Sequence, residues 1–551
     1  DAWLNRFFHD ELLPVLSPLG LDPAHPFPRI LNKSLNFIVQ LSGKDAFGRN
    51  TGFAVVQAPR ALPRLIQIPP NVTGSGPHDF VFLSSVIHAY VDDLFPADLL
   101  VDEEDAEDLL EALEGELSQR QWGDTVRLEV AHNCPEAMWQ FIMDEIQLSP
   151  ADVYQVNGPV NLNRLMALPD LVDRPQLKYP PHTPRVSKAL ASGDIFAAIR
   201  ERDHLLHHPY DSFSSVLEFI RQSAKDPRVL AIKQTLYRTG SKSLVVDALC
   251  DAARNGKEVT VVIELRARFD EADNINLAER LQDVGAHVVY GVVGYKTHAK
   301  MCLVVRREEG AAELPGGLRY YTHLSTGNYH PKTARLYTDY GLLTADASIG
   351  KDAHSVFLQL TSLGKVIKLN RLLQSPFTLN EGMHARIERE IAHAEAGKPA
   401  RLIAKMNSLV EPEIIKKLYT ASRAGVKIEL LVRGMCSLRP GVPGLSENIT
   451  VRSIIGRFLE HHRVFYFLNN GEEEVWLSSA DWMERNLFRR VEVAFPVLDK
   501  ALRARLLQHL EAYVVDTAQS WLLQQDGRYL RLETAGDAVP VQQQLMDEGH
   551  P

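Results

Sequence analysis

The spacing of apolar positions changes near residue 200. From there, β-branched runs such as "VLAIKQTLYRTG" and "EVTVVIELRARFD" are separated by a stretch of helical spacing, "SLVVDALCDAARNGK". Strand, helix and strand in this order indicate a βαβ unit, so we expect a parallel sheet with helices on its faces. Further strands are predicted at "HVVYGVVGY", "AKMCLVVRRE" and "LRYYTHLSTGNY", and a helix over 355–376 closes the unit.

Residues 1–190 mix helical and strand patterns with many prolines, which predicts an α+β head domain. The acidic run "VDEEDAEDLLEALEGELSQR" spaces its leucines as a helix does. We expect a solvated amphipathic helix there. The proline-rich passage "VDRPQLKYPPHTPRV" is typical of a domain boundary.

An internal repeat indicates the architecture of the remainder. "VTVVIELRARF", "HVVYGVVGYKTHAK", "YTHLSTGNY" and "YGLLTAD" are matched by "VKIELLVRGMC", "ITVRSIIGRFLEHHR", "VWLSSADW" and "VEVAFPVLD". Each copy contains a histidine and a basic residue that open a strand, then a strand that ends in Ser or Thr. The repeat predicts two similar α/β domains that face each other, over 191–374 and 375–551.

Composition narrows the classes of partner. The chain has 551 residues and a net charge of −10, so it lacks the bulk positive field of a nucleic-acid-binding protein, and any polyanion site must be a local concentration of Arg and Lys. Its four cysteines have no C-x-x-C spacing, which fits a reducing cytosol. No apolar run is long enough to insert into a membrane, although peripheral attachment stays open. The chain starts at Asp1 inside a helix-like segment, and we expect an N-terminal part to be missing.

Two histidines at strand starts are followed two positions later by a basic residue. Side chains of a strand alternate between its faces, so His298 and Lys300 project the same way, as do His461 and Arg463, whereas His462 is expected on the opposite face. Neutral imidazole is a nucleophile toward phosphorus, and a neighbouring cation can hold the phosphoryl oxygens. One histidine could attack while the other assists the leaving or accepting oxygen. A single such pair is more often a surface feature, but the second copy favours catalysis.

Cationic and polar side chains are concentrated at the predicted strand ends. Ligand sites of parallel α/β sheets lie beyond the carboxyl ends of the strands, so Arg238, Arg268 and Arg433 are candidates for phosphate contacts. For any one of them, pairing with a carboxylate such as Asp270 is the alternative. Tyr337 could stack on a base or cap a strand. The expected phosphate and polyphosphate contacts are Lys300, Asn328, Lys332, Arg335 and Arg463.

Long motifs in 200–500 carry a family resemblance. "HHPYDSF", "AIKQTLYRTG", "ELRARFDEADNINLAERL", "YKTHAKM", "TGNYHPKTARLYTDYGLLT", "LLVRGMCSL" and "SSADWMERNLFRRVEV" resemble the family-1 polyphosphate kinases, whose fold is that of the phospholipase D superfamily. "ELLPVLSPLGLDPAHPFPRI" resembles the start of that family's head domain. The resemblance implies two phospholipase D-like α/β domains after an α+β head domain, and an N-terminal helical domain that this chain lacks.

The resemblance also implies an activity and a set of site residues. The activity is reversible transfer of the terminal phosphate of ATP to inorganic polyphosphate, with ATP and ADP as nucleotides. His298 matches the histidine that the family phosphorylates, and His461 the histidine opposite it that contacts the nucleotide phosphates. Further nucleotide contacts fall on Tyr337 and Arg433. A cytoplasmic homo-oligomer, dimer or tetramer, is expected by the same analogy.

The resemblance implies Mg²⁺ at the arginines that match Arg238 and Arg268. A guanidinium has no free lone pair, so we expect these arginines to hold the phosphates that carry the ion, with water completing its shell.

Two other functions use the same residues. A phospholipase D-like phosphodiesterase would need no nucleotide, and an inactive polyanion-binding scaffold would not need His298. Clustered arginines argue against a singly charged diester substrate. "HAKMCLVV" also lacks the aspartate that phospholipase D enzymes have shortly after this motif, which favours the kinase.

Overall fold

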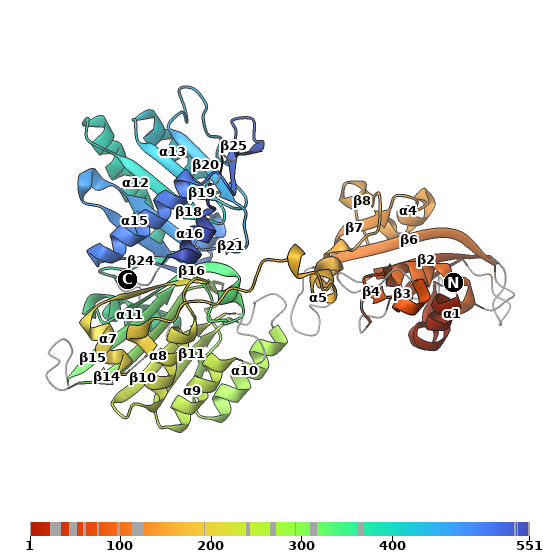
Figure 1. Cartoon of the computed structure of the whole chain (residues 1–551), viewed down its shortest axis with the longest axis horizontal. Coiled ribbons are helices and arrows are strands. Elements are labelled where there is room, and N and C mark those ends of the chain that lie inside the picture. Colours follow the sequence, from red (N-terminus) through yellow and green to blue (C-terminus); the bar gives the residue numbers. More distant parts are fainter. Residues whose placement is uncertain are drawn as a thin grey trace. The chain divides into compact units, whose positions relative to one another are not determined.

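The computed structural model consists of two compact units, Asp1–Pro180 and Pro181–Pro551, and each is described by itself (Figure 1). The residues outside the description are 1, 22–34, 43–51, 59–61, 74–76, 96–99, 113–124, 192, 238–242, 265–270, 293, 309–316, 362–367, 534–535, 537 and 549–551.

The first unit is α+β. Its sheet contains, in spatial order, β1 (Pro18–Leu21), β3 (Phe53–Gln57), β2 (Leu35–Ser42), β6 (Leu100–Ala112), β7 (Thr125–Ala131) and β8 (Val153–Val156). A core that includes Phe8, Phe37 and Ile87 covers one face, with α1 (Ala2–Phe7) and α3 (Leu83–Ala89) packed there. Helix α4 (Glu136–Glu145) packs on the other face through Met138 and Ile142. The predicted α+β class of this part is confirmed.

The expected helix in the acidic run is wrong. The first part of the run lies in β6, which pairs with β2 on one side and β7 on the other, and the rest lies outside the described residues. β2 pairs with Leu100–Leu109 and β7 with Asp108–Ala112, and this tertiary pairing overrides the helical spacing of the leucines.

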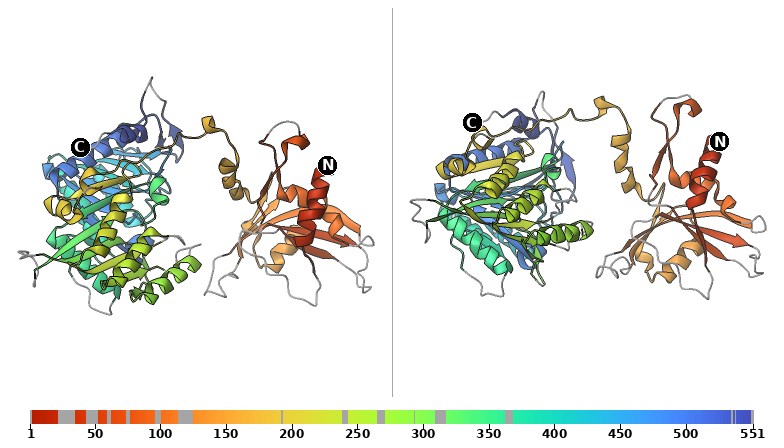
Figure 2. Two further views of the ribbon diagram at one scale, coloured as in Figure 1. Left: turned by 60° about the horizontal axis from the view of Figure 1, so that its bottom comes forward. Right: turned by 90° about the horizontal axis from the view of Figure 1, so that it is seen from below.

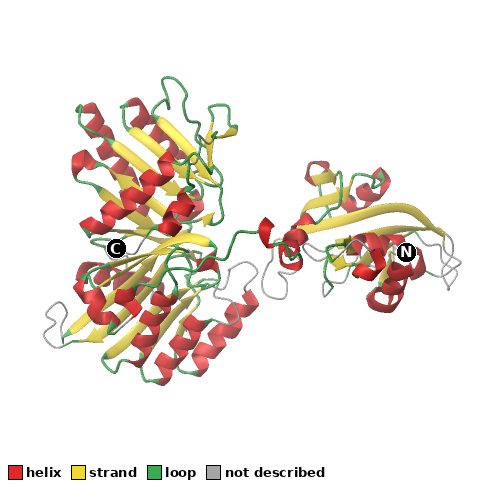
Figure 3. Cartoon of the chain, in the orientation of Figure 1, coloured by secondary structure: helices red, strands yellow, loops and turns green. Residues whose placement is uncertain are grey.

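The second unit contains two sheets, drawn in yellow in Figure 3. In the first sheet, neighbours run in the order β12 (His287–Val289), β11 (Glu258–Ile263), β10 (Val229–Leu236), β14 (Lys300–Arg307), β15 (Leu318–Ser325) and β16 (Tyr337–Thr344), and β9 (His204–His208) pairs with β16. In the second, the order is β24 (Arg490–Pro496), β23 (Glu474–Ser478), β22 (Arg463–Phe467), β18 (Arg401–Met406), β19 (Lys427–Val432), β20 (Ile449–Ile454), β25 (Ser520–Leu523) and β26 (Tyr529–Arg531), and β17 (Leu373–Ser375) pairs with β24.

Helices and sheets alternate as layers in this unit (Figures 1 and 2). One outer layer, on the first sheet, is α7 (Ile195–Glu201), α8 (Ser214–Lys225), α9 (Leu244–Arg254) and α10 (Glu271–Asp283). The layer between the sheets is α11 (Ala347–Thr361), α15 (Lys500–Val515) and α16 (Val541–Asp547). The other outer layer is α12 (Leu379–Glu395) and α13 (Pro412–Arg423). The predicted α/β class, with two similar halves that face each other, is confirmed.

Each half donates a short strand to the sheet of the other half. β13 (Lys296–Thr297) runs parallel to β24, with Lys296 opposite Arg490 and Thr297 opposite Val491. In the corresponding place, β21 (Leu459–Glu460) runs parallel to β16 of the first sheet. The two exchanged strands end immediately before His298 and His461, so each histidine enters the site from one half while its backbone is fixed to the other.

Two details of the predicted secondary structure are wrong. The first sheet is mixed, because β14 runs antiparallel to β10 although β10, β11 and β12 are parallel. The predicted helix over 355–376 ends earlier, since α11 stops at Thr361 and Leu373–Ser375 is a strand held by β24. The domain boundaries at 190 and 374 remain a prediction. Among the described residues, no helix has both the length and the apolar character to cross a membrane.

We predict that the second unit loses stability as pH falls below 6.5. Burial lowers the pKa of His207, His323 and His462, so the native state binds fewer protons than the unfolded chain once the pH is below 6.5. Each such histidine contributes about 1.4 kcal/mol per pH unit to the slope. His207→Phe should flatten the dependence of the unfolding free energy on pH by one proton, measured by urea unfolding of the full chain between pH 8 and 5.5.

His207 suits this test because its ring stacks on Tyr340 at a centroid distance of 4.0 Å and, among the described residues, neither ring nitrogen has a hydrogen-bond partner. Phenylalanine therefore keeps the packing and removes only buried polar atoms. His287→Gln is the control, because that side chain is 69% exposed and its partner Glu258 is 63% exposed. Equal slopes for wild type and His207→Phe would contradict the prediction.

Candidate active site

His298 stands where the two halves meet. Its backbone N–H donates to the carbonyl of Val491 at 2.9 Å, which continues the pairing of β13 with β24. Its Nδ1 lies 2.9 Å from both carboxylate oxygens of Glu492, a fully buried residue of the opposite half. The Tyr237 ring packs edge-on against the imidazole at 5.1 Å. A carboxylate only accepts hydrogen bonds, so Nδ1–H donates and the Nε2 lone pair is left for chemistry.

His461 has the mirror-image environment. Its backbone N–H donates to the Thr338 hydroxyl at 3.0 Å, next to the pairing of β21 with β16. Its Nδ1 lies 2.9 Å from both oxygens of Asp339, which belongs to the first half. Each histidine is therefore held by a carboxylate from the half that does not contribute the histidine.

A hydroxyl fixes each of these carboxylates. Thr326 donates to Asp339 at 2.7 Å and accepts the backbone N–H of Tyr340 at 3.0 Å. Ser479 donates to Glu492 at 2.5 Å and accepts the backbone N–H of Val493 at 3.1 Å. Sequence reasoning missed both carboxylates. The repeat contained the signal, because "YTDYGLLT" and "RVEVAFPV" place an acidic residue at the same point of the last strand.

Both histidines are neutral near pH 7. Burial lowers the pKa of His298 well below 6.5, and the positive charges of Lys300 and Arg490 lower it further. Arg463 and His461 are close enough to contribute to the same shift. Burial also lowers the pKa of His461, although Asp339 opposes that effect. The imidazole of His298 thus keeps an available lone pair without losing a proton first.

The two carboxylates differ in their proton affinity. Burial would raise the pKa of Asp339, but the contacts with His461 and Thr326 outweigh burial and hold the pKa below 3.8. For Glu492 burial prevails, and its pKa lies above 4.5 despite the charges of Lys300 and Arg490. The half-sites are therefore alike in geometry and unequal in electrostatics.

The predicted cations Lys300 and Arg463 line this centre. The ammonium of Lys300 donates to the carbonyl of His298, and burial lowers its pKa to about 7. Arg463 donates to Asp481 through Nε at 3.3 Å and Nη2 at 2.9 Å. Its Nη1 lies 3.3 Å from Nε2 of His461. Lys300 can lose its proton near neutral pH, whereas the ion pair keeps Arg463 charged.

Tyr337 and Arg433 lie on the His461 side of the centre. The ring of Tyr337 is 5.3 Å from that of His461. Nε of Arg433 donates to Asn407 at 2.7 Å, and Asn407 also donates to Asp481. Burial lowers the pKa of Arg433, with a further contribution from Arg463, so the two guanidinium groups are near neighbours. The structure thus brings Tyr337, Arg433 and His461 together.

The other predicted residues have varied positions. Asn328 is half-buried in the loop between β15 and β16, and its side-chain oxygen has no hydrogen-bond partner among the described residues. Lys332 and Arg335 are exposed in the same loop. Arg238 and Arg268 lie outside the described residues. No group of three or more His, Cys, Asp and Glu side chains in the described part could hold a metal ion.

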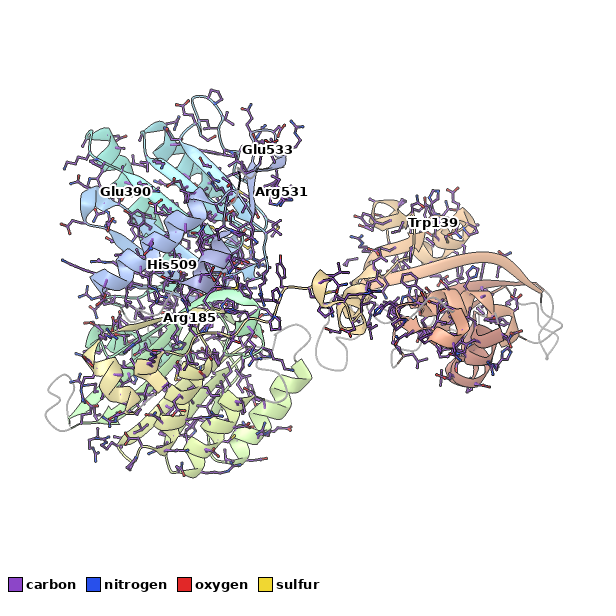
Figure 4. All side chains as sticks on the ribbon, in the orientation of Figure 1. Trp139, Arg185, Glu390, His509, Arg531 and Glu533 are labelled. Carbon is purple, nitrogen blue, oxygen red and sulfur yellow. The ribbon has the colours of Figure 1, made fainter. Side chains whose placement is uncertain are left out.

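His462 belongs to a buried aromatic cluster next to the site. Its ring packs against Tyr340 at 4.8 Å and Tyr513 at 5.8 Å. His509, labelled in Figure 4 on α15, accepts or donates a 2.7 Å hydrogen bond with the Tyr340 hydroxyl. This cluster packs against Tyr340 of the strand that carries Asp339.

Comparison with known proteins gives a consistent result along the whole chain. The sequence matches the family models "Polyphosphate kinase middle domain" over 1–168, "C-terminal domain 1" over 194–366 and "C-terminal domain 2" over 372–544. It is 55% identical to a polyphosphate kinase of Pseudomonas aeruginosa, over 98% of this chain and 79% of that protein. It is 56% identical to one of Neisseria meningitidis, over 97% of this chain and 79% of that protein.

A solved structure gives the same result for the fold. The crystal structure of a polyphosphate kinase from Porphyromonas gingivalis superimposes with a TM-score of 0.85 at 31% identity, over 99% of this chain and 82% of that one. The matched family models, the identity to these relatives and this shared fold together show that the chain belongs to the polyphosphate kinase family.

Proposed function

We propose that this chain is an ATP–polyphosphate phosphotransferase that works through a phosphohistidine at His298. The observation that carries the proposal is the convergence of two histidine–carboxylate pairs, supplied crosswise by the two halves, on a centre lined by Lys300 and Arg463. The names of the relatives support the substrate class.

In the first step, the Nε2 lone pair of His298 forms a bond to the terminal phosphorus of ATP. The bond from that phosphorus to the bridging oxygen breaks, and its electron pair leaves with ADP. The imidazole becomes positively charged, and Glu492 at Nδ1 stabilises that charge while Nδ1 keeps its proton. In the second step, a terminal oxygen of polyphosphate attacks the phosphorus, the P–N bond breaks, and neutral His298 is regenerated.

The remaining residues position the phosphates. Lys300 and Arg463 neutralise charge on the transferring group. His461, oriented by Asp339, contacts the nucleotide phosphates, and Tyr337 and Arg433 complete the nucleotide side. Lys332, Arg335 and Asn328 offer donors for the polyphosphate chain.

The described residues do not fit a protein-held magnesium site. Asp339 and Glu492 already accept hydrogen bonds from a histidine and a hydroxyl each, and guanidinium groups have no lone pair to offer. We therefore propose that magnesium enters as part of the nucleotide substrate, bound to its phosphates.

The proposal extends to the setting of the enzyme. All four cysteines are free thiols, which fits the reducing cytoplasm. ATP, ADP and inorganic polyphosphate are the proposed partners, and nucleic acid is not one of them. Assembly into a dimer or tetramer, and peripheral membrane contact, stay predictions from the sequence.

Replacement of His298 tests the intermediate. With ATP labelled at the terminal phosphate, the wild-type chain should acquire an acid-labile, alkali-stable label. His298→Ala should acquire none, because it lacks the imidazole nitrogen to which the phosphate is bonded. His393→Ala, a half-buried histidine of α12, is the matched control and should be labelled normally. A persistent label in His298→Ala would refute the phosphohistidine at this position.

Loss of the Glu492 charge should slow the same step. Glu492→Gln keeps the size of the side chain but removes the charge that stabilises the cationic imidazole, so labelling in rapid-mixing experiments should slow by about 10²- to 10⁴-fold. Glu473→Gln in the same half is the control, since Glu473 contacts the Tyr466 hydroxyl. Equal labelling rates in the two variants would contradict the role of Glu492.

Lys300 predicts a pH dependence. Its pKa of about 7 means that the ammonium is present below that pH and lost above it, so kcat/KM for ATP should fall as pH rises past about 7. Lys300→Arg keeps its charge and should flatten this alkaline limb, whatever its absolute rate. The pH dependence of kcat/KM is measured from initial rates between pH 6 and 9. An unchanged alkaline limb in Lys300→Arg would assign the titration to another group.

A further inference from the structure

A cavity lined by arginines lies in the second half, away from His298. Its volume is about 300 Å³, and it opens where β23 begins and β24 ends, with Trp476 opposite Pro496 in the pairing. Glu492 stands four residues before Pro496 on β24, which is about 13 Å along the strand at ~3.3 Å per residue. The cavity is therefore separate from the site described above.

Three arginines from different elements line this cavity. Arg371 comes from the loop before β17, Arg386 from α12 and Arg503 from α15. Figure 4 labels Glu390, one turn beyond Arg386 on α12. The backbone of Arg371 is fixed, because its N–H donates to the buried carboxylate of Asp352 at 2.6 Å. The fold thus fixes where the backbone of Arg371 lies, while its side chain is exposed at the edge of the cavity.

The lining also contains one carboxylate, Glu474, and its oxygens already accept hydrogen bonds. Glu474 accepts from Arg386 at 2.9 Å, from Arg389 at 2.5 Å and from the indole N–H of Trp476 at 3.0 Å. Two buried nitrogens of Arg389, Nε and Nη2, have no partner in the described part of the chain. Arg389 is not part of the lining, which itself has three arginines and one carboxylate, and that carboxylate is already paired.

The other two guanidinium groups are free to receive an anion. Arg503 gives Nη1 to the backbone carbonyl of Glu473 at 3.1 Å and is otherwise uncommitted among the described residues. Over the same residues, the Arg371 side chain has neither a hydrogen bond nor an ion pair. Planar guanidinium groups match phosphate oxygens with two parallel N–H donors each.

The walls of the cavity restrict the chemistry of its ligand. Trp476 is only 5% exposed, and Arg386 lies over its ring at 4.0 Å, so no face is left for a base to stack on. Apolar walls from Val475, Val497 and Leu498 exclude water from part of the space and strengthen the cationic field. The volume is at the lower end of the range of about 300–1,000 Å³ for small-ligand sites. A compact, multiply charged, non-aromatic anion fits these limits.

We propose that this cavity binds a chain of two or three phosphates, either free or as the phosphate end of a nucleotide, at a site distinct from the phosphotransfer centre. Arg371 and Arg503 donate hydrogen bonds to the phosphate oxygens. Arg386, which is held in place by Glu474 and Trp476, adds a positive charge next to them. The site does not depend on the phosphohistidine chemistry, because none of its residues contacts His298 or Glu492.

The test is calorimetric titration of tripolyphosphate into the full chain. Wild type should bind at two sites, and a double variant, Arg371→Gln with Arg503→Gln, should lose one of them or weaken it at least 10-fold while the labelling of His298 by ATP is unchanged. Arg528→Gln, an arginine 77% exposed and paired with Asp526, is the control and should keep both sites. Identical stoichiometry and affinities in wild type and the double variant would overturn the proposal.

Two further arms identify the source of the phosphates. If ATP also loses one binding event in the double variant, the cavity accepts nucleotide phosphates. If the loss is confined to tripolyphosphate, the cavity is specific for the inorganic chain. Both results support an anion site, and neither depends on whether His298 is phosphorylated.

Discussion

The structure of the second unit depends on one constraint, the crosswise contact between a histidine of one half and a carboxylate of the other. The parallel pairing of β13 with β24 and of β21 with β16, extended by one residue, places His298 opposite Glu492 and His461 opposite Asp339. Register in a sheet is all or none, because a shift by one residue moves every side chain to the other face. Docking of the halves and assembly of the site are therefore the same event.

Burial sets the protonation state of the histidine in this contact. In water an imidazole beside a carboxylate would gain a proton at mildly acidic pH, but the low-dielectric interface favours the neutral ring even with the carboxylate 2.9 Å away. Burial acts in the same direction on both acids, but contacts with His461 and Thr326 outweigh it at Asp339, so the pKa is raised for Glu492 and lowered for Asp339. Two copies of one geometry thus differ in electrostatics, which is the asymmetry that the proposed division of roles between His298 and His461 requires.

The sequence predicted the features that depend on local pattern. Apolar periodicity located β10, β11 and α9, and the repeat predicted the facing halves, each with a histidine where the halves meet. It could not predict that β14 runs antiparallel to β10, because strand direction depends on the connection and not on the spacing of Val and Ile. It missed Glu492 and Asp339, because a single acidic residue within a strand gives no signal until the two copies of the repeat are aligned on their last strands. The acidic run gave the opposite kind of error. Its leucine spacing predicted a helix, but pairing with β2 and β7 makes its first part the strand β6.

Divergence between the two halves is clearest away from the histidines. Ser325 and Ser478 occupy equivalent places, since each hydroxyl donates to the carbonyl that follows the paired acid, Tyr340 or Val493. Two residues earlier on the same strands, the first half has His323, buried and bonded to the Tyr329 hydroxyl, whereas the second half has Trp476 beneath Arg386. One copy fills the position with a neutral, self-contained core. The other places Trp476 beside Arg386, Arg389 and Glu474, so an ion-pair network surrounds the position that a neutral histidine fills in the first half.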